Sequence, residues 1–165
     1  MANQVLAPEQ LLRKASDMVP VLKDRAAATE VLRRIPDESV QDLLASRLHL
    51  IGVPERFGGL NVDYGLMLEV GAVLGSGCGS TSWCYSIWAA HSWLVGFWPL
   101  EAQKEVFGNG ADTLVSSSLN AGRSTLERVT GGFRLAGRWE FSSGSGAAGW
   151  VMVGGRGEEW WWGLL

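Results

Sequence analysis

The residues best suited to chemistry lie in one short stretch near the C-terminal end of the chain. Residues 142–149 are all serine, glycine or alanine, and they separate two apolar strand patterns, 133–141 and 150–153. Small residues leave hydroxyl and backbone N–H groups accessible, so a flat polar ring or a phosphate could approach this backbone closely. The same composition is also typical of a solvated connection between two strands.

His91 is the second candidate, because it lies inside an apolar run, residues 83–98. A neutral imidazole in such surroundings can accept a proton. The alternative is a core histidine that is hydrogen-bonded to a backbone carbonyl. The sequence has no Ser-His-Asp pattern and no Gly-x-Gly-x-x-Gly turn between a strand and a helix. Two histidines are also too few for a typical catalytic zinc site, so we expect no metal.

The strand before the serine stretch is predicted from alternating side chains. Phe133, Leu135, Trp139 and Phe141 share one face of an extended segment, with charged residues between them. The Gly-Gly pair at 131–132 predicts a tight hairpin, whose partner strand includes residues 127–130. A further strand is expected at 114–119, followed by a turn at 120–122.

The rest of the chain predicts helices, which begin with an apolar 3.6-residue period after Pro8. Pro20 predicts a kink or a break near the middle of the first helix. Asp63 is expected to cap the third helix, and Ser80 or Thr81 the fourth. The expected helices cover residues 8–34, 37–48, 63–74, 83–97 and 99–107. The fold class is therefore α+β, with an N-terminal helical domain (1–110) and the beginning of an antiparallel β domain (111–165).

Composition excludes several classes of partner. The net charge of −3, with scattered Lys and Arg, argues against a nucleic-acid surface. The apolar run 83–98 is too short and too often interrupted to cross a bilayer, and the N-terminus does not resemble a signal peptide. Cys78 and Cys84 have neither metal-binding nor redox spacing. We therefore expect a cytoplasmic protein with reduced cysteines.

Three motifs resemble one known superfamily. Residues 137–144 read Gly-Arg-Trp-Glu-Phe-Ser-Ser-Gly, with Trp150 following. They resemble the flavin-facing strand and loop of the acyl-CoA dehydrogenase superfamily. The Trp-x-Phe-Ser-Ser-Gly form is similar to that of the flavin-dependent aromatic monooxygenases, whereas fatty acyl dehydrogenases tend to carry Trp-Ile-Thr-Asn-Gly. Residues 52–59 and 99–108 resemble two further motifs of the superfamily.

The resemblance implies an oxygenase component that hydroxylates a small aromatic or phenolic substrate with O2. A separate reductase would supply reduced flavin, either FMN or FAD, and the full-length protein would be a homotetramer. His91 would lie near the substrate phenol. Ser143 would act beside the reactive edge of the flavin. The residues implied in cofactor binding are Ser117, Ser118, Asn120, Trp139, Ser142 and Ser143.

Each implied role has a structural alternative. The serines at 116–118 can be ordinary strand residues without a role in binding. Trp139 can fill the interior of a barrel instead of packing on the flavin ring. The resemblance covers only the N-terminal two-fifths of a family member, so we expect a truncated or frame-shifted fragment that is inactive by itself. The rival functions are an acyl-CoA dehydrogenase, an inactive remnant and a helical interaction module.

Overall fold

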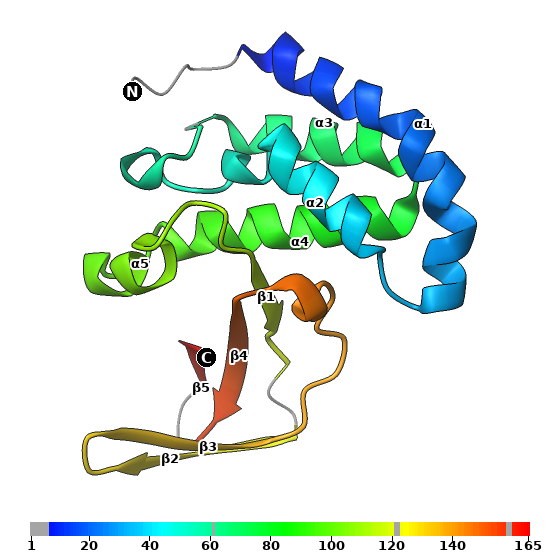
Figure 1. Ribbon diagram of the computed structural model, residues 1–165. Coiled ribbons are helices and arrows are strands. Elements are labelled where there is room, and N and C mark those ends of the chain that lie inside the picture. The colour runs from blue at the N-terminus through cyan, green and yellow to red at the C-terminus, as the bar shows by residue number, and fades with distance from the viewer. Residues whose placement is uncertain (1–6, 61, 121–122, 158–159) are drawn as a thin grey trace.

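The computed structural model describes residues 7–60, 62–120, 123–157 and 160–165, and it places helices first and strands after them (Figure 1). The α-helices are α1 (Pro8–Leu32), α2 (Asp37–Ser46), α3 (Tyr64–Gly75), α4 (Gly79–Val95) and α5 (Leu100–Phe107). The strands are β1 (Val115–Ser118), β2 (Ser124–Val129), β3 (Gly132–Gly137), β4 (Trp150–Arg156) and β5 (Trp160–Leu164). Short 3-10 helices are η1 (Leu48–Ile51), η2 (Glu55–Phe57) and η3 (Ser145–Ala147). The predicted α+β fold class is confirmed.

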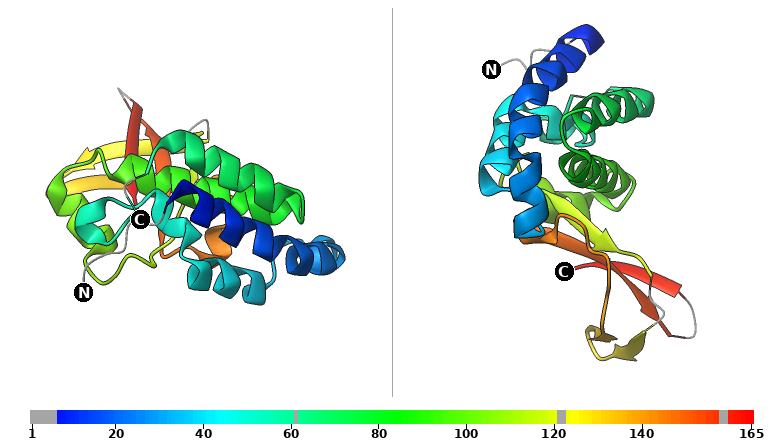
Figure 2. Two further views of the ribbon diagram at one scale, coloured as in Figure 1. Left: turned by 90° about the horizontal axis from the view of Figure 1, so that it is seen from above. Right: turned by 90° about the vertical axis from the view of Figure 1, so that its right-hand side faces the viewer.

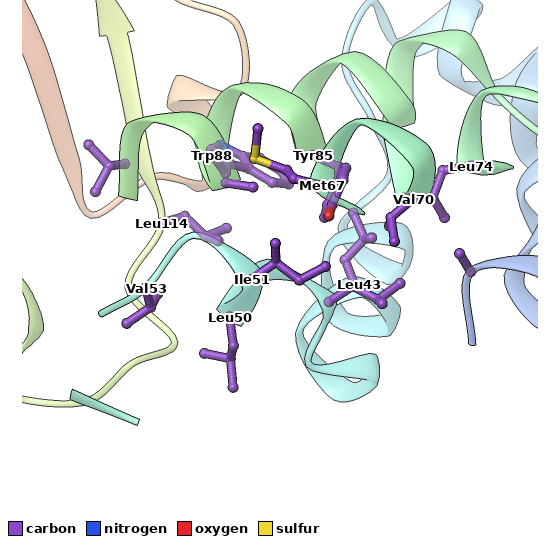
Figure 3. Close-up of a cluster of buried hydrophobic side chains, with 14 of the residues drawn as sticks. Leu43, Leu50, Ile51, Val53, Met67, Val70, Leu74, Tyr85, Trp88 and Leu114 are labelled. Carbon is purple, nitrogen blue, oxygen red and sulfur yellow. The ribbon is translucent and has the colours of Figure 1, made fainter. Parts of the chain in front are cut away.

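The core lies between the helices, and α4 forms one side of it. Tyr85 and Trp88 of α4 are almost completely buried and face α3, α2 and η1 (Figure 3). The apolar residues around them are Leu43, Leu50, Ile51, Met67, Val70 and Leu74. Helix α4 also packs against β1, so it joins the helical layer to the sheet (Figure 2). Side chains of α4 can therefore contribute to both layers.

Helix α1 is continuous, so one of the two outcomes predicted at Pro20, a break, is wrong. A proline inside a helix removes one N–H donor and crowds the preceding turn. Pro20 lies on the exposed face of α1, where water can satisfy the carbonyl that loses its donor. The buried face of α1 continues past Pro20, with Leu11 and Ala15 before it and Leu22 after it in the core.

The predicted start of α3 is confirmed, and that of α4 is wrong. Asp63 accepts a hydrogen bond from the Gly65 N–H at 2.7 Å, as an N-cap should. Helix α4 begins at Gly79 after Cys78, earlier than the predicted cap at Ser80 or Thr81. Glycine has a low helix propensity, which explains why the sequence pattern placed the start too late.

The strands form a mixed three-stranded sheet and a separate hairpin. The sheet order is β1-β4-β5, with β1 parallel to β4 and β5 antiparallel to it. The β2–β3 hairpin lies between β1 and β4 in sequence, and its strands pair in the register Glu127 with Arg134. The hairpin turns at Thr130-Gly131, where Gly131 has φ +85°, so the predicted hairpin is confirmed.

Strand β3 ends at Gly137, so the prediction of a strand reaching Phe141 is wrong. The chain passes so close to Ser124 and to the Arg123 carbonyl that a Cβ on Gly137 would lie 2.8 Å from that oxygen. Phe141 adopts φ +60° and its side chain is 93% exposed, so it does not share a buried face with Trp139.

Three smaller expectations concern the membrane, the cysteines and one turn. No described helix combines the length and the apolar character needed to cross a bilayer. Cys78 and Cys84 are both free thiols. In the turn expected at 120–122, Asn120 is described, whereas residues 121 and 122 lie outside the described residues.

Candidate functional site

The serine loop is attached to β1 by hydroxyl groups. The buried Ser116 Oγ lies 2.9 Å from Ser142 Oγ and donates to the Ser143 carbonyl at 3.0 Å. Two residues further along β1, Ser118 Oγ donates to the Glu140 carbonyl at 2.6 Å. Ser116 and Ser118 point to the same side of β1, because side chains alternate along a strand. Together they fix residues 140–143 beside the sheet.

Helix α4 holds the same loop through two indole groups. Trp83 Nε1 donates to Ser143 Oγ at 3.0 Å, and Trp88 Nε1 donates to the Gly144 carbonyl at 3.2 Å. Gly144 adopts φ +75°, and a Cβ there would lie 2.4 Å from Trp88 Nε1. Only glycine allows both this φ and this close approach. The loop therefore needs a glycine at 144 and an indole at 88.

A cleft of about 530 Å³ opens between the loop, α4 and the connection from α1 to α2. The indole of Trp83 is 60% exposed and gives the cleft an aromatic wall. Buried apolar residues and polar rim groups complete the lining, which includes Ile35, Val40, Trp88, Arg33, Ser80 and residues 142–147. The volume falls in the range of small-molecule sites.

His91 forms a second polar group with Ser117. Its Nε2 lies 3.0 Å from Ser117 Oγ, and its side chain is only 6% exposed. Burial lowers the pKa of His91 below its ordinary value of 6.5, although the Val115 backbone opposes the shift. The imidazole is therefore neutral at pH 7 and can accept a proton. Nδ1 has no hydrogen-bond partner among the described residues.

The two groups lie next to each other but not in one cavity. His91 follows Trp88 by three residues on α4, a rise of about 4.5 Å along the helix. Ser117 points to the opposite side of β1 from Ser116, so it meets α4 instead of the serine loop. His91 does not line the cleft. The structure thus brings Ser142 and Ser143 together, and separately His91 and Ser117.

The remaining expected residues lie outside the cleft. Ser118 is buried and uses its hydroxyl hydrogen on the Glu140 carbonyl. Asn120 is exposed at the end of β1. Trp139 donates its indole N–H to the Gly154 carbonyl at 2.8 Å, which ties it to β4. Their assignment to a cofactor stays a prediction.

Sequence reasoning missed Ser116 as a site residue, and it treated the tryptophans of residues 83–98 only as a group that could line a pocket for a planar ligand or fill the core. Side chains alternate along a strand, so this pattern would have placed Ser116 and Ser118 on one side of β1 and Ser117 on the other. The tryptophans are spaced five residues apart on α4, and no sequence signal showed that both indoles reach the loop. Among the described residues, no group of three or more His, Cys, Asp or Glu side chains could hold a metal ion.

Comparison with known proteins gives the site its context. No protein-family model matches the chain. The flavin-dependent monooxygenase oxygenase subunit HsaA of Mycobacterium tuberculosis is 39% identical over 147 residues, which cover 89% of this chain and 37% of that protein. The crystal structure of the M. tuberculosis HsaA monooxygenase superposes with a TM-score of 0.91 at 35% identity, over 97% of this chain and 45% of that one. The chain is homologous to flavin-dependent monooxygenase oxygenase subunits.

A second oxygenase subunit of this kind is named for its cofactor. The oxygenase component of the FADH2-dependent resorcinol hydroxylase of a Rhizobium species is 31% identical over 143 residues, covering 87% of this chain and 35% of that protein. The chain therefore spans well under half the length of these oxygenase subunits. The prediction that it corresponds to only part of a family member is confirmed by these shares.

The residues present fit the edge of a flavin ring. The pyrimidine part of a flavin offers two carbonyl oxygens and the N1 nitrogen as acceptors. The loop offers matching donors, because the Gly144 N–H and the Ser143 hydroxyl hydrogen engage no acceptor among the described residues. A Cβ on Gly146 would meet nothing within 4 Å, so the backbone is open to a flat ligand there.

Proposed function

We propose that this chain is the part of an aromatic monooxygenase that holds the reactive edge of reduced flavin beside a phenolic substrate. The homology to oxygenase subunits and the donor-rich serine loop support this function. A flavin, FMN or FAD, would lie against residues 142–144. The small aromatic substrate would lie near His91.

The observation that carries the proposal is the His91–Ser117 pair, one helical turn from the Trp88–Gly144 contact. A neutral His91 accepts the phenolic proton and so makes the ring carbon more nucleophilic. Ser117 holds Nε2 in place. Reduced flavin, when bound, supplies the two electrons with which one atom of O2 enters the ring and the other leaves as water.

Ser142 and Ser143 would hold the flavin edge. Ser143 Oγ accepts the Trp83 N–H, which leaves its own hydrogen for a ligand acceptor. Fixed donors stabilise charge that develops on the flavin without reorganising during the reaction. The two oxygenase names imply that another component supplies the reduced flavin, so we propose a separate reductase as partner. A homotetramer of the full-length protein is proposed from the resemblance alone.

The proposal is tested by substituting the matching histidine in a full-length relative. His91→Asn should lower the yield of hydroxylated product per reduced flavin at least tenfold, because general-base catalysis contributes roughly 10²–10⁴ in rate. The control is His49→Asn, which changes a buried histidine bound to Asp112, outside the cleft.

Product is measured by chromatography on folded protein, with melting temperatures checked for both variants. Equal product from the two variants would remove His91 from the reaction. Reduction of bound flavin by an acyl-CoA would favour the dehydrogenase alternative instead.

A further inference from the structure

Ser116 is a polar residue with no exposed surface in the middle of β1. Its hydroxyl bridges the serine loop, since it contacts Ser142 Oγ at 2.9 Å and the Ser143 carbonyl at 3.0 Å. Breaking this bridge would leave the Ser143 carbonyl without its Ser116 donor. A carbonyl that loses its donor while it stays away from water is destabilised.

The hydrogen bonds of this cluster have one consistent set of directions. A serine hydroxyl has one hydrogen and two lone pairs, whereas a carbonyl can only accept. Because Ser116 donates to the Ser143 carbonyl, the Ser142 hydroxyl donates to Ser116. The Ser142 hydrogen is therefore used within the cluster, and Ser116 stays in contact with both loop serines.

The contacts of Ser116 also determine the direction of the Gly144 N–H, which is the next backbone donor in the loop. All described peptide bonds are trans, so the Gly144 N–H points opposite to the Ser143 carbonyl. Because that carbonyl faces Ser116, the N–H faces away from β1, and Gly144 lines the cleft. The Trp83 indole N–H donates to Ser143 Oγ at 3.0 Å. Hydroxyl and amide donors are thereby oriented before any ligand arrives.

We propose that Ser116 is a positioning residue, which anchors Ser142 and the Ser143 carbonyl and so orients the Ser143 hydroxyl and the Gly144 N–H toward an acceptor edge of reduced flavin. This inference rests on the proposed function for the identity of the ligand. The orientation itself depends only on the contacts of Ser116.

Hydrogen exchange tests the orientation without any ligand. The N–H groups of Ser145, Ala147 and Ala148 form the internal hydrogen bonds of the loop. Ser116→Ala should speed their exchange at least tenfold relative to the unchanged protein. Ser82→Ala is the matched control, because Ser82 also donates to a backbone carbonyl, that of Gly71, but between α3 and α4. Equal exchange in the two variants would overturn the proposal.

A double-mutant cycle separates positioning from simple stability. The dissociation constant of reduced FMN is measured anaerobically for Ser116→Ala, Ser142→Ala and the double variant. Ser116→Ala should weaken binding about tenfold, equivalent to about 1.4 kcal/mol, and should have much less effect when Ser142 is already alanine. Ser82→Ala should change the constant less than twofold. Additive effects, or an equal effect of Ser82→Ala, would contradict a positioning role.

The experiments distinguish a failure of the Ser116 proposal from a failure of the proposed function. If the unchanged chain binds no reduced FMN at millimolar concentration, the flavin site on this chain is contradicted. The exchange comparison then still decides whether Ser116 orients the loop.

Discussion

At the scale of single residues, the site depends on neighbours that a linear motif does not show. The sequence pointed to Ser142, Ser143, His91 and Ser117. The structure shows that Ser117 contacts His91 and that Ser116 and Trp83 contact the two loop serines. These partners come from a strand and a helix 25 or more residues away in the chain. Their identity follows from the packing of α4 on β1, which residue types alone do not determine.

Gly144→Ala should destabilise the protein and loosen the loop. The added Cβ would overlap Trp88 Nε1, and the φ of +75° is strained for alanine. We expect a loss of roughly 1–3 kcal/mol in the free energy of unfolding, measured by urea denaturation. Gly146→Ala is the control, because its Cβ would meet open space. Similar losses in both variants would show that the Trp88 contact is unimportant.

At the scale of elements, periodicity predicted where helices and strands lie better than where they end. A strand that includes Phe133 was correct, but β3 ends at Gly137, where a Cβ would meet Ser124 of the paired strand. The proline and glycine residues also gave wrong helix ends, because α1 continues through Pro20 and α4 begins at Gly79. Burial of one helix face outweighs a single unfavourable residue.

Pro20→Ala should stabilise α1. An interior proline costs up to about 3 kcal/mol relative to alanine, and Pro20 lies on the exposed face, where the replacement creates no cavity. The melting temperature should rise by several degrees. Asp17→Ala, at another exposed position of α1, should change stability by less than about 0.5 kcal/mol. A lower melting temperature for Pro20→Ala would mean that the proline is accommodated without cost.

At the scale of the whole molecule, two buried histidines link stability to pH. His49 contacts Asp112 at 3.0 Å and connects η1 to the segment after α5. Burial lowers the pKa of His49, and Asp112 opposes this only in part. Burial likewise lowers the pKa of His91. Both imidazoles are therefore neutral in the folded protein at pH values where the unfolded chain begins to bind protons.

The free energy of unfolding should fall as the pH drops below about 6.5, the value for an unperturbed histidine. The unfolded chain binds more protons than the folded protein between that pH and the lowered pKa values, with a slope of at most about 1.4 kcal/mol per pH unit for each histidine. Urea denaturation from pH 8 to pH 5 measures this slope. Replacing His49 and His91 by glutamine should flatten the curve, and an unchanged slope would refute the linkage.

The whole molecule also shows which parts of the function were predictable. The serine loop and the flavin-binding family were predicted from motifs, because close approach to a backbone requires small residues at fixed positions. The separation of His91 from the cleft was not predictable, because it depends on which sides of β1 its serines face. The division into domains at residue 110 stays a prediction.

The central claim is that the serine loop and the helix carrying His91 together hold a reduced flavin and an aromatic ring. Anaerobic hydrogen exchange of this chain, with and without millimolar reduced FMN, tests it most directly. The account predicts slower exchange at residues 143–148 and no change at the exposed hairpin of β2 and β3. Protection of the hairpin instead of the loop, or no protection anywhere, would contradict it.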